Sequence, residues 1–321
     1  MSPRGDLAVV IPARNEFDRI GATVTAAARI VGVDIVVVVD DGSADGTGAQ
    51  AASAGANVVR HARNRGKAAA LETGAEAVRV IEADRAAASG RPAGRPRHLL
   101  FLDADLGDTA AQAGPLAGPV RAGEADMTIA VFADRVKLGG HGVVLGLSGA
   151  GIERATGWRP AEPLNGQRCL TRAAFEAARP LARGWGAETG LTIDLLRKGM
   201  RIVEVQVPLA HRATGGDLHS QLHRAHQLAD VARALAARRP WRRPAAPPDA
   251  RGADAPRAGV SAGWANGGGA DVLPAGVSAA GVSGADAGGA NGVGADVLQA
   301  GADRARASGT DAGRQGRAGD Q

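Results

Sequence analysis

The stretch that most constrains the fold is residues 33–39, which read VDIVVVV. A strand this continuously apolar must be covered on both faces, as in the centre of a parallel sheet between two layers of helices. Shorter apolar runs, which we also expect to be strands, lie at residues 6–11, 58–59, 98–102 and 127–132. Helical patterns separate these runs. The sequence therefore predicts an α/β fold with a mostly parallel sheet and right-handed crossovers.

The spacing of apolar residues places the helices between and after these strands. In the first part of the chain we expect helices at residues 16–30, 50–54, 68–81 and 110–121. In the second part we expect helices at residues 143–155, 172–178, 188–198 and 218–239, and strands at residues 167–170 and 202–207. Asn15 is a suitable N-cap for the first helix. Residues 83–97 are polar with several Pro and Gly, and we expect a loop there.

The composition changes sharply at Pro244. From there to Gln321 the residues Gly, Ala, Ser, Asp and Pro dominate, and apolar periodicity is lost. Such a segment buries too little apolar surface to offset the entropy of ordering it, so we expect residues 244–321 to be a disordered, low-complexity tail. Residues 1–243 are expected to form the folded domain.

The charge of the chain limits its partners. The tail holds six Arg and eight Asp, so of the formal net charge of +5 the folded part carries +7. A moderately basic domain suits anionic ligands such as nucleotide phosphates, and also membranes or nucleic acid. Aromatic residues make up only 2% of the chain and no zinc-finger spacing is present. We therefore expect no nucleic-acid partner.

Cysteine content and hydropathy indicate the compartment. Cys169 is the sole cysteine, so an internal disulfide is impossible and a reducing compartment is expected. We see neither a signal-peptide pattern nor a run of about 20 apolar residues. The expected location is the cytoplasm. The basic end of helix 218–239, which contains Arg238, Arg239, Arg242 and Arg243, is either a solvated helix end or a peripheral contact to the inner membrane face.

Two carboxylates, Asp103 and Asp105, follow the apolar run at residues 98–102. Side chains just past a strand end lie in the crevice at the carboxyl edge of an open α/β sheet, where ligands bind. One carboxylate could bind a divalent cation while the other orients a sugar hydroxyl, because Mg²⁺ is usually held by one or two carboxylates plus substrate phosphates. The pattern suggests a metal-bridged nucleotide diphosphate. A solvated turn is the alternative.

Four motifs occur in one order that resembles family-2 glycosyltransferases with the GT-A fold, a Rossmann-like sheet flanked by helices. They are IPARNE at residues 11–16, DDGSADGT at 40–47, NRGKAAAL at 64–71 and LDAD at 102–105. Three later segments, at residues 166–168, 184–191 and 211–212, are similar to the glucosyl-3-phosphoglycerate synthase-like branch, which we group with the dolichyl-phosphate mannose synthase-like branch. The resemblance implies a nucleotide-binding half at residues 1–132 and an acceptor half, with the C-terminal amphipathic helix, at residues 133–243.

The resemblance also implies roles for individual residues. The nucleotide and donor sugar would be bound by Pro12, Ala13, Arg14, Asn15, Glu16, Asp41, Gly42, Lys67, Asp103, Ala104, Arg168 and Trp185. The metal, Mn²⁺ or Mg²⁺, would be bound by Asp105 and His211, and the catalytic residues would be Glu188 and Asp105. Structural alternatives exist: Lys67 as a solvated lysine in a first helical turn, Glu188 as a carboxylate that suits a helix N-terminus, and Trp185 as a core anchor.

The resemblance implies a metal-dependent enzyme that moves one sugar from a nucleotide sugar, expected to be UDP-linked, to a small or lipid-phosphate acceptor. A Gln-x-x-Arg-Trp block and membrane spans, which processive polysaccharide synthases have, are not found, and this favours single-sugar transfer. Family 2 implies inversion of the anomeric centre and the second branch implies retention; both remain open. Two other functions also remain open: a nucleotidyltransferase on a related sheet, and a non-catalytic nucleotide-sugar-binding scaffold.

Overall fold

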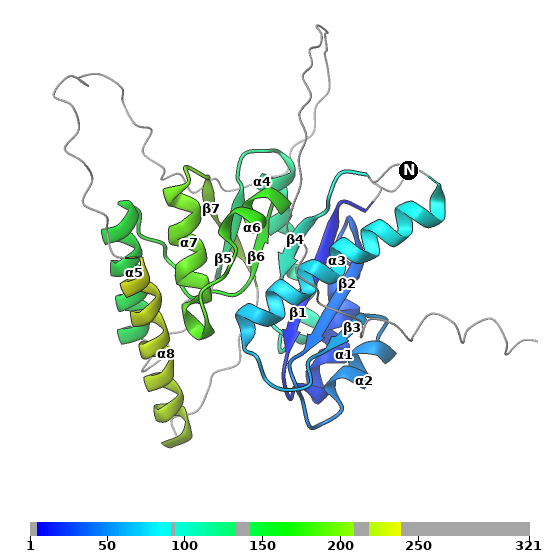
Figure 1. Cartoon of the computed structure of the whole chain (residues 1–321), viewed down its shortest axis with the longest axis horizontal. Helices are drawn as coiled ribbons and strands as arrows, with labels where there is room; N and C mark the ends of the chain where they lie inside the picture. The colour runs from blue at the N-terminus through cyan, green and yellow to red at the C-terminus, as the bar shows by residue number, and fades with distance from the viewer. Residues whose placement is uncertain (1–4, 91–93, 133–141, 209–217, 239–321) are drawn as a thin grey trace, which may run out of the picture. The chain divides into compact units, whose positions relative to one another are not determined.

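The computed structural model of the chain describes residues 5–90, 94–132, 142–208 and 218–238 (Figure 1). Residues 1–243 form one compact unit by their contacts. The predicted disordered tail at residues 244–321 lies outside the described residues, as do His211, Arg239, Arg242 and Arg243.

One seven-stranded sheet organises the domain. Its strands are β1 (Leu7–Ala13), β2 (Val33–Asp40), β3 (Asn57–Arg60), β4 (His98–Phe101), β5 (Met127–Phe132), β6 (Arg168–Leu170) and β7 (Ile202–Val207). They lie in the order β3-β2-β1-β4-β6-β5-β7. Strand β6 runs antiparallel to β4 and β5, and the other neighbouring pairs are parallel. The predicted α/β class with a mostly parallel sheet is confirmed.

Helices connect and cover these strands. They are α1 (Phe17–Ala27), α2 (Thr47–Ser53), α3 (Lys67–Ser89), α4 (Ala117–Arg121), α5 (Gly142–Thr156), α6 (Arg172–Ala178), α7 (Ala187–Arg197) and α8 (Leu218–Ala237), with 3₁₀ helices η1 (Gly107–Leu116) and η2 (Gly184–Gly186). Each predicted helix has a counterpart, and most boundaries agree within a few residues; α3, predicted to end at residue 81, is the main exception. The segment predicted as a helix at residues 110–121 is mainly 3₁₀, with Pro115 inside η1.

Our prediction of a loop at residues 83–97 is wrong in its first half, because α3 continues to Ser89. Ala86, Ala87 and Ala88 have the highest helix propensity of any residue type, and this outweighs the polar character of the segment. The helix ends at Gly90, whose φ of 62° is left-handed. The extra turns place Arg85 2.9 Å from Asp34 at the start of β2, which ties the end of α3 to the sheet.

The two faces of the sheet bury two separate cores. In β1, Leu7, Val9 and Ile11 pack into the core shared with α1 and η1. Ala8 and Val10 point the other way, into the core shared with α3, α6 and α7. Helix α3 comes very close to β1, because a Cβ on Gly74 would lie 2.3 Å from Val10 Cγ1. This close packing fixes α3, and with it the side chain at its N-terminus, over the sheet.

The strand order reverses at β1, whose neighbours are β2 on one side and β4 on the other. Loops leaving β1 and β4 therefore diverge at their carboxyl ends and open a crevice, the usual ligand site of an open α/β sheet. The polar loop after β2 and the Asp103-Ala104-Asp105 segment after β4 both lie at this edge. The fold thus brings the sequence motifs of the first half to one place.

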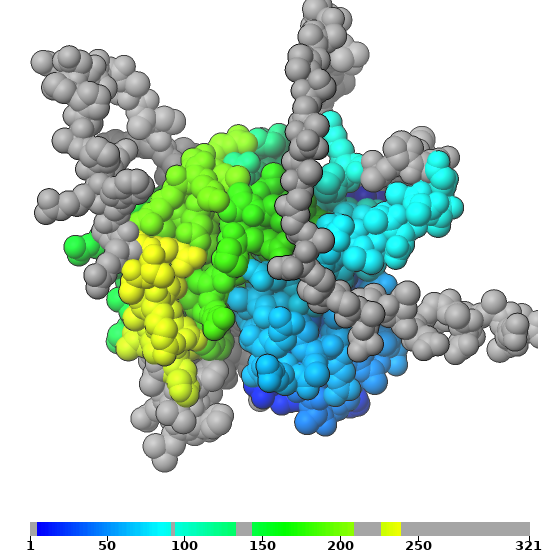
Figure 2. Space-filling model, viewed as in Figure 1, coloured from blue at the N-terminus to red at the C-terminus, as the bar shows by residue number. Residues whose placement is uncertain are grey.

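Helices α5, α7 and α8 contact one another in the second half of the domain (Figures 1 and 2). Helix α8 is attached to α7 by an ion pair between Arg238 and Asp194. Arg238 belongs to the basic helix end that we considered for membrane contact, and here it pairs within the protein. Among the residues that the structure describes, no helix combines the length and the apolar character needed to cross a bilayer.

Candidate active site

The candidate site is centred on Lys67, the first residue of α3. Its ammonium Nζ lies 2.8 Å from Asp103 Oδ1, just after β4, and 2.9 Å from Glu188 Oε1, in the first turn of α7. Burial alone would lower the pKa of Lys67, but the two carboxylates outweigh it and hold the pKa above its ordinary value. Lys67 therefore carries a positive charge throughout the physiological range, between two groups from distant parts of the chain.

Glu188 is a buried carboxylate, only 4% exposed. Its ion pair with Lys67 accounts for Oε1, whereas Oε2 accepts no hydrogen bond from any residue that the structure describes. A buried carboxylate oxygen without a donor is costly, and such groups are rare unless a water or ligand supplies the donor. Oε2 of Glu188 is thus a buried acceptor whose hydrogen bond no described residue supplies.

Gly166 and Gln167 complete the surroundings of Asp103. Gln167 Nε2 donates to Asp103 Oδ2 at 2.7 Å, so the carboxylate is held from both sides. A Cβ on Gly166 would lie 2.4 Å from Lys67 Nζ and 2.8 Å from Asp103 Oδ1. Only glycine leaves room for this pair. Both residues lie in the segment 166–168 that we singled out by resemblance, but we assigned a role only to Arg168 in that segment.

The loops after β1 and β2 are tied together. Asn15, with a left-handed φ of 54°, donates its N–H to Ser43 Oγ at 3.0 Å, and its side-chain Oδ1 accepts from Ala44 N at 3.0 Å. Glu16 N donates to Thr47 Oγ1 at 2.8 Å. Our prediction that Asn15 caps α1 is therefore wrong, since its side chain bridges to the next loop and Glu16 takes the cap position.

The other residues predicted to bind the nucleoside lie partly in a strand and partly in loops. Pro12 and Ala13 lie in β1, so the loop begins at Arg14, which is exposed. Gly42 adopts a left-handed φ of 73°, and a Cβ there would lie 2.8 Å from the backbone nitrogen of Asn64. The loop after β2 therefore packs tightly on the loop after β3, and both face the same sheet edge.

Asp41 is buried, with its carboxylate facing the loop that precedes α3. Its Oδ1 accepts from His61 Nδ1 at 2.6 Å and from Arg65 N at 2.8 Å, while Oδ2 accepts from Gly66 N at 2.8 Å. Burial raises the pKa of Asp41, but these hydrogen bonds outweigh it and lower the pKa below its ordinary value. Three protein donors thus already engage the carboxylate that we predicted to contact the nucleoside.

The carboxylate of Asp105 differs from that of Asp103 in its hydrogen bonds. The backbone carbonyl of Asp105 accepts from Arg19 Nη1 at 3.1 Å, but no described residue donates to its carboxylate, which is partly exposed. Between the two, Ala104 is buried and its carbonyl accepts from Thr23 Oγ1 at 2.8 Å. A carboxylate without a protein partner beside a crevice is suited to a hard cation. Within the described residues no cluster of three or more potential metal ligands is present, and His211 lies outside them.

The Arg168 guanidinium is buried and bonded to protein acceptors, whereas we expected it to contact a phosphate. The residue is 1% exposed, and its guanidinium donates to the Asn165 carbonyl at 2.8 Å, to Thr192 Oγ1 at 2.9 Å and to the Glu188 carbonyl at 3.2 Å. Burial lowers the pKa of Arg168 to about 10, which still leaves it charged at neutral pH. Its geometry anchors the first turns of α7, and so the backbone that carries Glu188.

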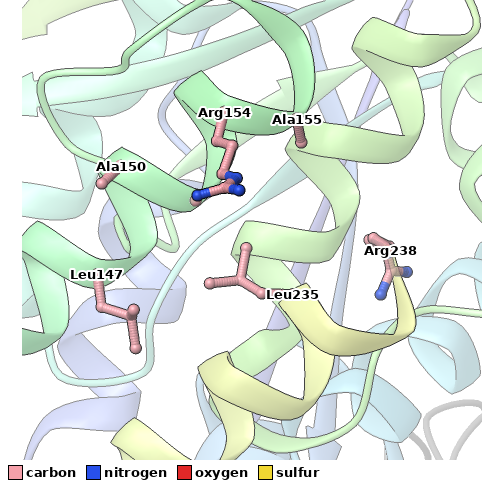
Figure 3. A pocket seen from close by; sticks show the side chains of 7 residues that line it. Leu147, Ala150, Arg154, Ala155, Leu235 and Arg238 are labelled. Atoms are coloured by element: carbon pink, nitrogen blue, oxygen red, sulfur yellow. The ribbon is translucent and has the colours of Figure 1, made fainter. Parts of the chain in front are cut away.

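Trp185 lies in η2, directly before α7, and its residue is 37% exposed. The backbone N–H of Trp185 donates to Asp230 Oδ2 of α8 at 3.3 Å. A separate groove of about 290 Å³ runs between α5 and α8 (Figure 3), lined by small and apolar residues with Arg154 and Arg238 at one end. None of the residues that line it belongs to the Lys67 cluster. We therefore centre the candidate site on the cluster of Lys67, Asp103 and Glu188, and not on the groove between α5 and α8.

The comparisons with known proteins agree with this geometry. Residues 8–142 match the family model described as "Glycosyl transferase family 2". This part of the chain is thus similar to glycosyl transferase family 2. The match covers every strand up to β5 and the motifs after β1, β2, β3 and β4. The family resemblance predicted from those motifs is confirmed.

Similar proteins extend the likeness into the second half. A curated relative, glucosyl-3-phosphoglycerate synthase of Mycolicibacterium paratuberculosis, is 29% identical over 205 residues, which are 59% of this chain and 59% of the relative. The chain thus matches less than two thirds of that relative's length. Crystal structures of glucosyl-3-phosphoglycerate synthase from Mycobacterium tuberculosis are also similar. One, with Mn²⁺, uridine diphosphate and phosphoglyceric acid, is 25% identical with a TM-score of 0.55, over 72% of this chain and 78% of that one. Another, with Mg²⁺ and uridine diphosphate, is 26% identical with a TM-score of 0.54, over the same shares.

Proposed function

We propose that this chain is a metal-dependent glycosyltransferase that moves one sugar from a UDP-linked donor to a small phosphorylated acceptor. The observation that carries the proposal is the position of Lys67, 2.8 Å from Asp103 and 2.9 Å from Glu188 at the crevice edge of a family-2 domain. The M. tuberculosis relative binds uridine diphosphate and phosphoglyceric acid, which supports the donor base and makes phosphoglycerate the first acceptor to test.

The leaving group explains the need for positive charge. As the bond between the sugar and the diphosphate breaks, negative charge grows on the β-phosphate, and fixed cations at that point stabilise the transition state. Lys67 supplies one such charge, held in place by its two carboxylates. Asp103, which is fixed by Lys67 and Gln167, presents acceptor oxygens to the ribose or donor sugar hydroxyls.

A divalent cation would supply the second charge by polarising the diphosphate oxygens. Asp105 fits such a cation, because its carboxylate is partly exposed and has no described protein partner. We propose Asp105 and His211 as its protein ligands, and Mn²⁺ or Mg²⁺ as the ion. The relative's crystal structures contain either ion together with uridine diphosphate.

Glu188 is proposed to bind a hydroxyl through Oε2, which lacks a donor among the described residues. It would act either as a base that takes the proton of the acceptor hydroxyl or as a clamp that orients a sugar. The variant Glu188→Gln separates these roles. Loss of a base lowers kcat by about 10²–10⁴-fold, whereas loss of a clamp raises KM and leaves kcat closer to that of the wild type.

The decisive experiment is a donor panel with the purified chain, phosphoglycerate and Mn²⁺ or Mg²⁺, scored by release of nucleoside diphosphate. We expect release of UDP that stops on chelation of the metal, and loss of turnover in Asp105→Ala. Asp108→Ala removes a nearby exposed carboxylate and serves as the matched control. Release of pyrophosphate would indicate a nucleotidyltransferase instead, and binding of UDP-sugars without turnover on any acceptor would indicate a scaffold.

A further inference from the structure

His61, a residue that none of the sequence motifs includes, lies buried between the nucleotide-side loops, just after β3. Its Nδ1 is 2.6 Å from Asp41 Oδ1 and its Nε2 is 3.0 Å from Thr73 Oγ1. An ionised carboxylate can only accept, so the ring carries a proton on Nδ1 and donates it to Asp41. In the neutral ring, Nε2 then accepts from the hydroxyl of Thr73. His61 therefore joins the loop after β2 to the second turn of α3.

Asp41 connects His61 to the residues just before α3. Its two oxygens accept from the backbone nitrogens of Arg65 and Gly66, the two residues directly before Lys67. Gly66 has a left-handed φ of 88°, and no atom lies within 4 Å of the place where a Cβ would stand. Side-chain packing at this position therefore does not fix the backbone. Asp41 accepts from both residues that lead into Lys67, and Asn64 Oδ1 is a second acceptor of the Gly66 N–H, at 2.9 Å.

The same helix is held at two points. Thr73 contacts the ring of His61, and Gly66 contacts the carboxylate that the ring binds. A carboxylate that is held by a charged or neutral imidazole donor keeps its orientation; without that donor it can turn about its own χ angles, and the two backbone bonds weaken with it. The chain of contacts runs from His61 to Asp41, to Gly66, and ends at Lys67 between Asp103 and Glu188.

We propose that His61 is a positioning residue for donor binding: it orients Asp41, which fixes the Gly66 backbone and so sets where the Lys67 ammonium meets the diphosphate. The proposal rests on the proposed function, in which Lys67 contacts the diphosphate of a UDP-linked donor. Among the described residues, the ring nitrogens of His61 form hydrogen bonds with Asp41 and Thr73, and none with Lys67, Asp103 or Glu188. Its effect on the donor is therefore indirect.

Three single variants separate the two contacts of the ring. His61→Ala removes both. His61→Asn keeps an N–H close to the position of Nδ1 and so keeps the bond to Asp41, but loses the contact with Thr73. Thr73→Val removes only the contact with Nε2, with little change of volume. In the presence of Mn²⁺ we expect His61→Ala to bind UDP about tenfold more weakly, the size of one lost hydrogen bond to a charged group. We expect His61→Asn and Thr73→Val to bind within about twofold of the wild type, because neither loses the bond to Asp41.

A double-mutant cycle with Lys67→Ala tests the route of the effect. If His61 acts through Lys67, His61→Ala costs little further UDP affinity in a chain that already lacks the lysine, and the two losses are strongly non-additive. A purely structural role of His61 predicts additive losses. The measurement is the Kd of UDP by calorimetry on the full chain, with the thermal midpoint recorded for each variant.

The outcomes distinguish the inference from the function on which it rests. Wild-type protein that binds neither UDP nor a UDP-sugar overturns the proposed function. Wild-type protein that binds UDP, together with additive losses in the cycle, overturns the role of His61 alone. If His61→Ala does not fold, His61→Asn decides: a folded His61→Asn with tenfold weaker UDP binding contradicts the proposal, and one that binds like the wild type supports it.

Discussion

Lys67 Nζ and Glu188 Oε1 lie 2.9 Å apart, although Lys67 begins α3, before β4, and Glu188 lies in the first turn of α7, after β6. The ion pair joins the two halves of the domain at the edge of the sheet. Strand β6 makes this possible, because it inserts between β4 and β5 and brings Gly166 and Gln167 beside Asp103. Both halves therefore contribute to one site.

Removal of the lysine should destabilise the domain as well as inactivate it. In Lys67→Met, the carboxylates of Asp103 and Glu188 lose their common cation, and the buried Glu188 is left with an uncompensated charge. We expect the free energy of unfolding to fall by about 2–3 kcal/mol, somewhat below the range for fully buried pairs because the Lys67 side chain is 24% exposed. Urea denaturation measures this. The double variant Lys67→Met/Glu188→Gln should recover part of the loss, and a double variant less stable than Lys67→Met would contradict the ion-pair argument.

Stability should depend on pH through Asp41. The pKa of Asp41 is lower in the folded protein than its ordinary value of 3.8. A lowered pKa contributes stability that is present above 3.8 and is lost as the pH falls through the lower folded value. We expect Asp41→Asn to be less stable than the wild type at pH 7, with the gap narrowing as the pH falls below about 4. Denaturant midpoints at several pH values measure the gap. Asp108→Asn, an exposed carboxylate in η1, should show little gap at any of them.

Much of the first half could be predicted from the sequence because its signals are local. Apolar runs such as residues 33–39 can only be buried strands, and the polar motifs directly follow them, so the sheet edge collects them without further information. The helix at residues 83–89 was missed because Pro92 and the nearby glycines suggested a loop, whereas a helix can continue to the last alanine before a left-handed Gly90.

The contacts of the site were harder to predict, since they depend on tertiary packing. Nothing local indicates that Glu188 meets Lys67, or that Gly166 must be small for Lys67 and Asp103 to pair. A charged residue in a three-residue strand looked available to a phosphate, yet Arg168 is buried and donates to carbonyls of its own fold. Helix and strand periodicity predicts which face of an element is buried. It does not predict which residue a long polar side chain contacts across the core.

The close packing at Gly166 gives a sharp test of the pair beside it. In Gly166→Ala the new methyl group would lie 2.4 Å from Lys67 Nζ, so the ammonium must move away from Asp103. We expect at least about a tenfold loss of kcat/KM, because a displacement of about 1 Å in a binding group can cost far more. Steady-state kinetics measure this. Gly146→Ala is the control: its Cβ meets nothing within 4 Å in α5, so activity should persist and stability should rise slightly. Equal activity of the two variants would argue against a tightly packed pair.

The buried position of Arg168 predicts a loss of stability that is separate from donor binding. In Arg168→Ala the buried guanidinium that donates to the carbonyls of Asn165 and Pro163 and to the hydroxyl of Thr192 is lost. The Glu188 carbonyl keeps the Thr192 hydroxyl as a donor at 2.9 Å. We expect the free energy of unfolding to fall by about 3 kcal/mol or more, since several buried acceptors are left unpaired at once. If the folded variant still binds UDP with near wild-type affinity at a temperature well below its unfolding midpoint, Arg168 acts on the fold. An unchanged midpoint together with a much weaker Kd for UDP would instead restore the phosphate contact that the sequence suggested.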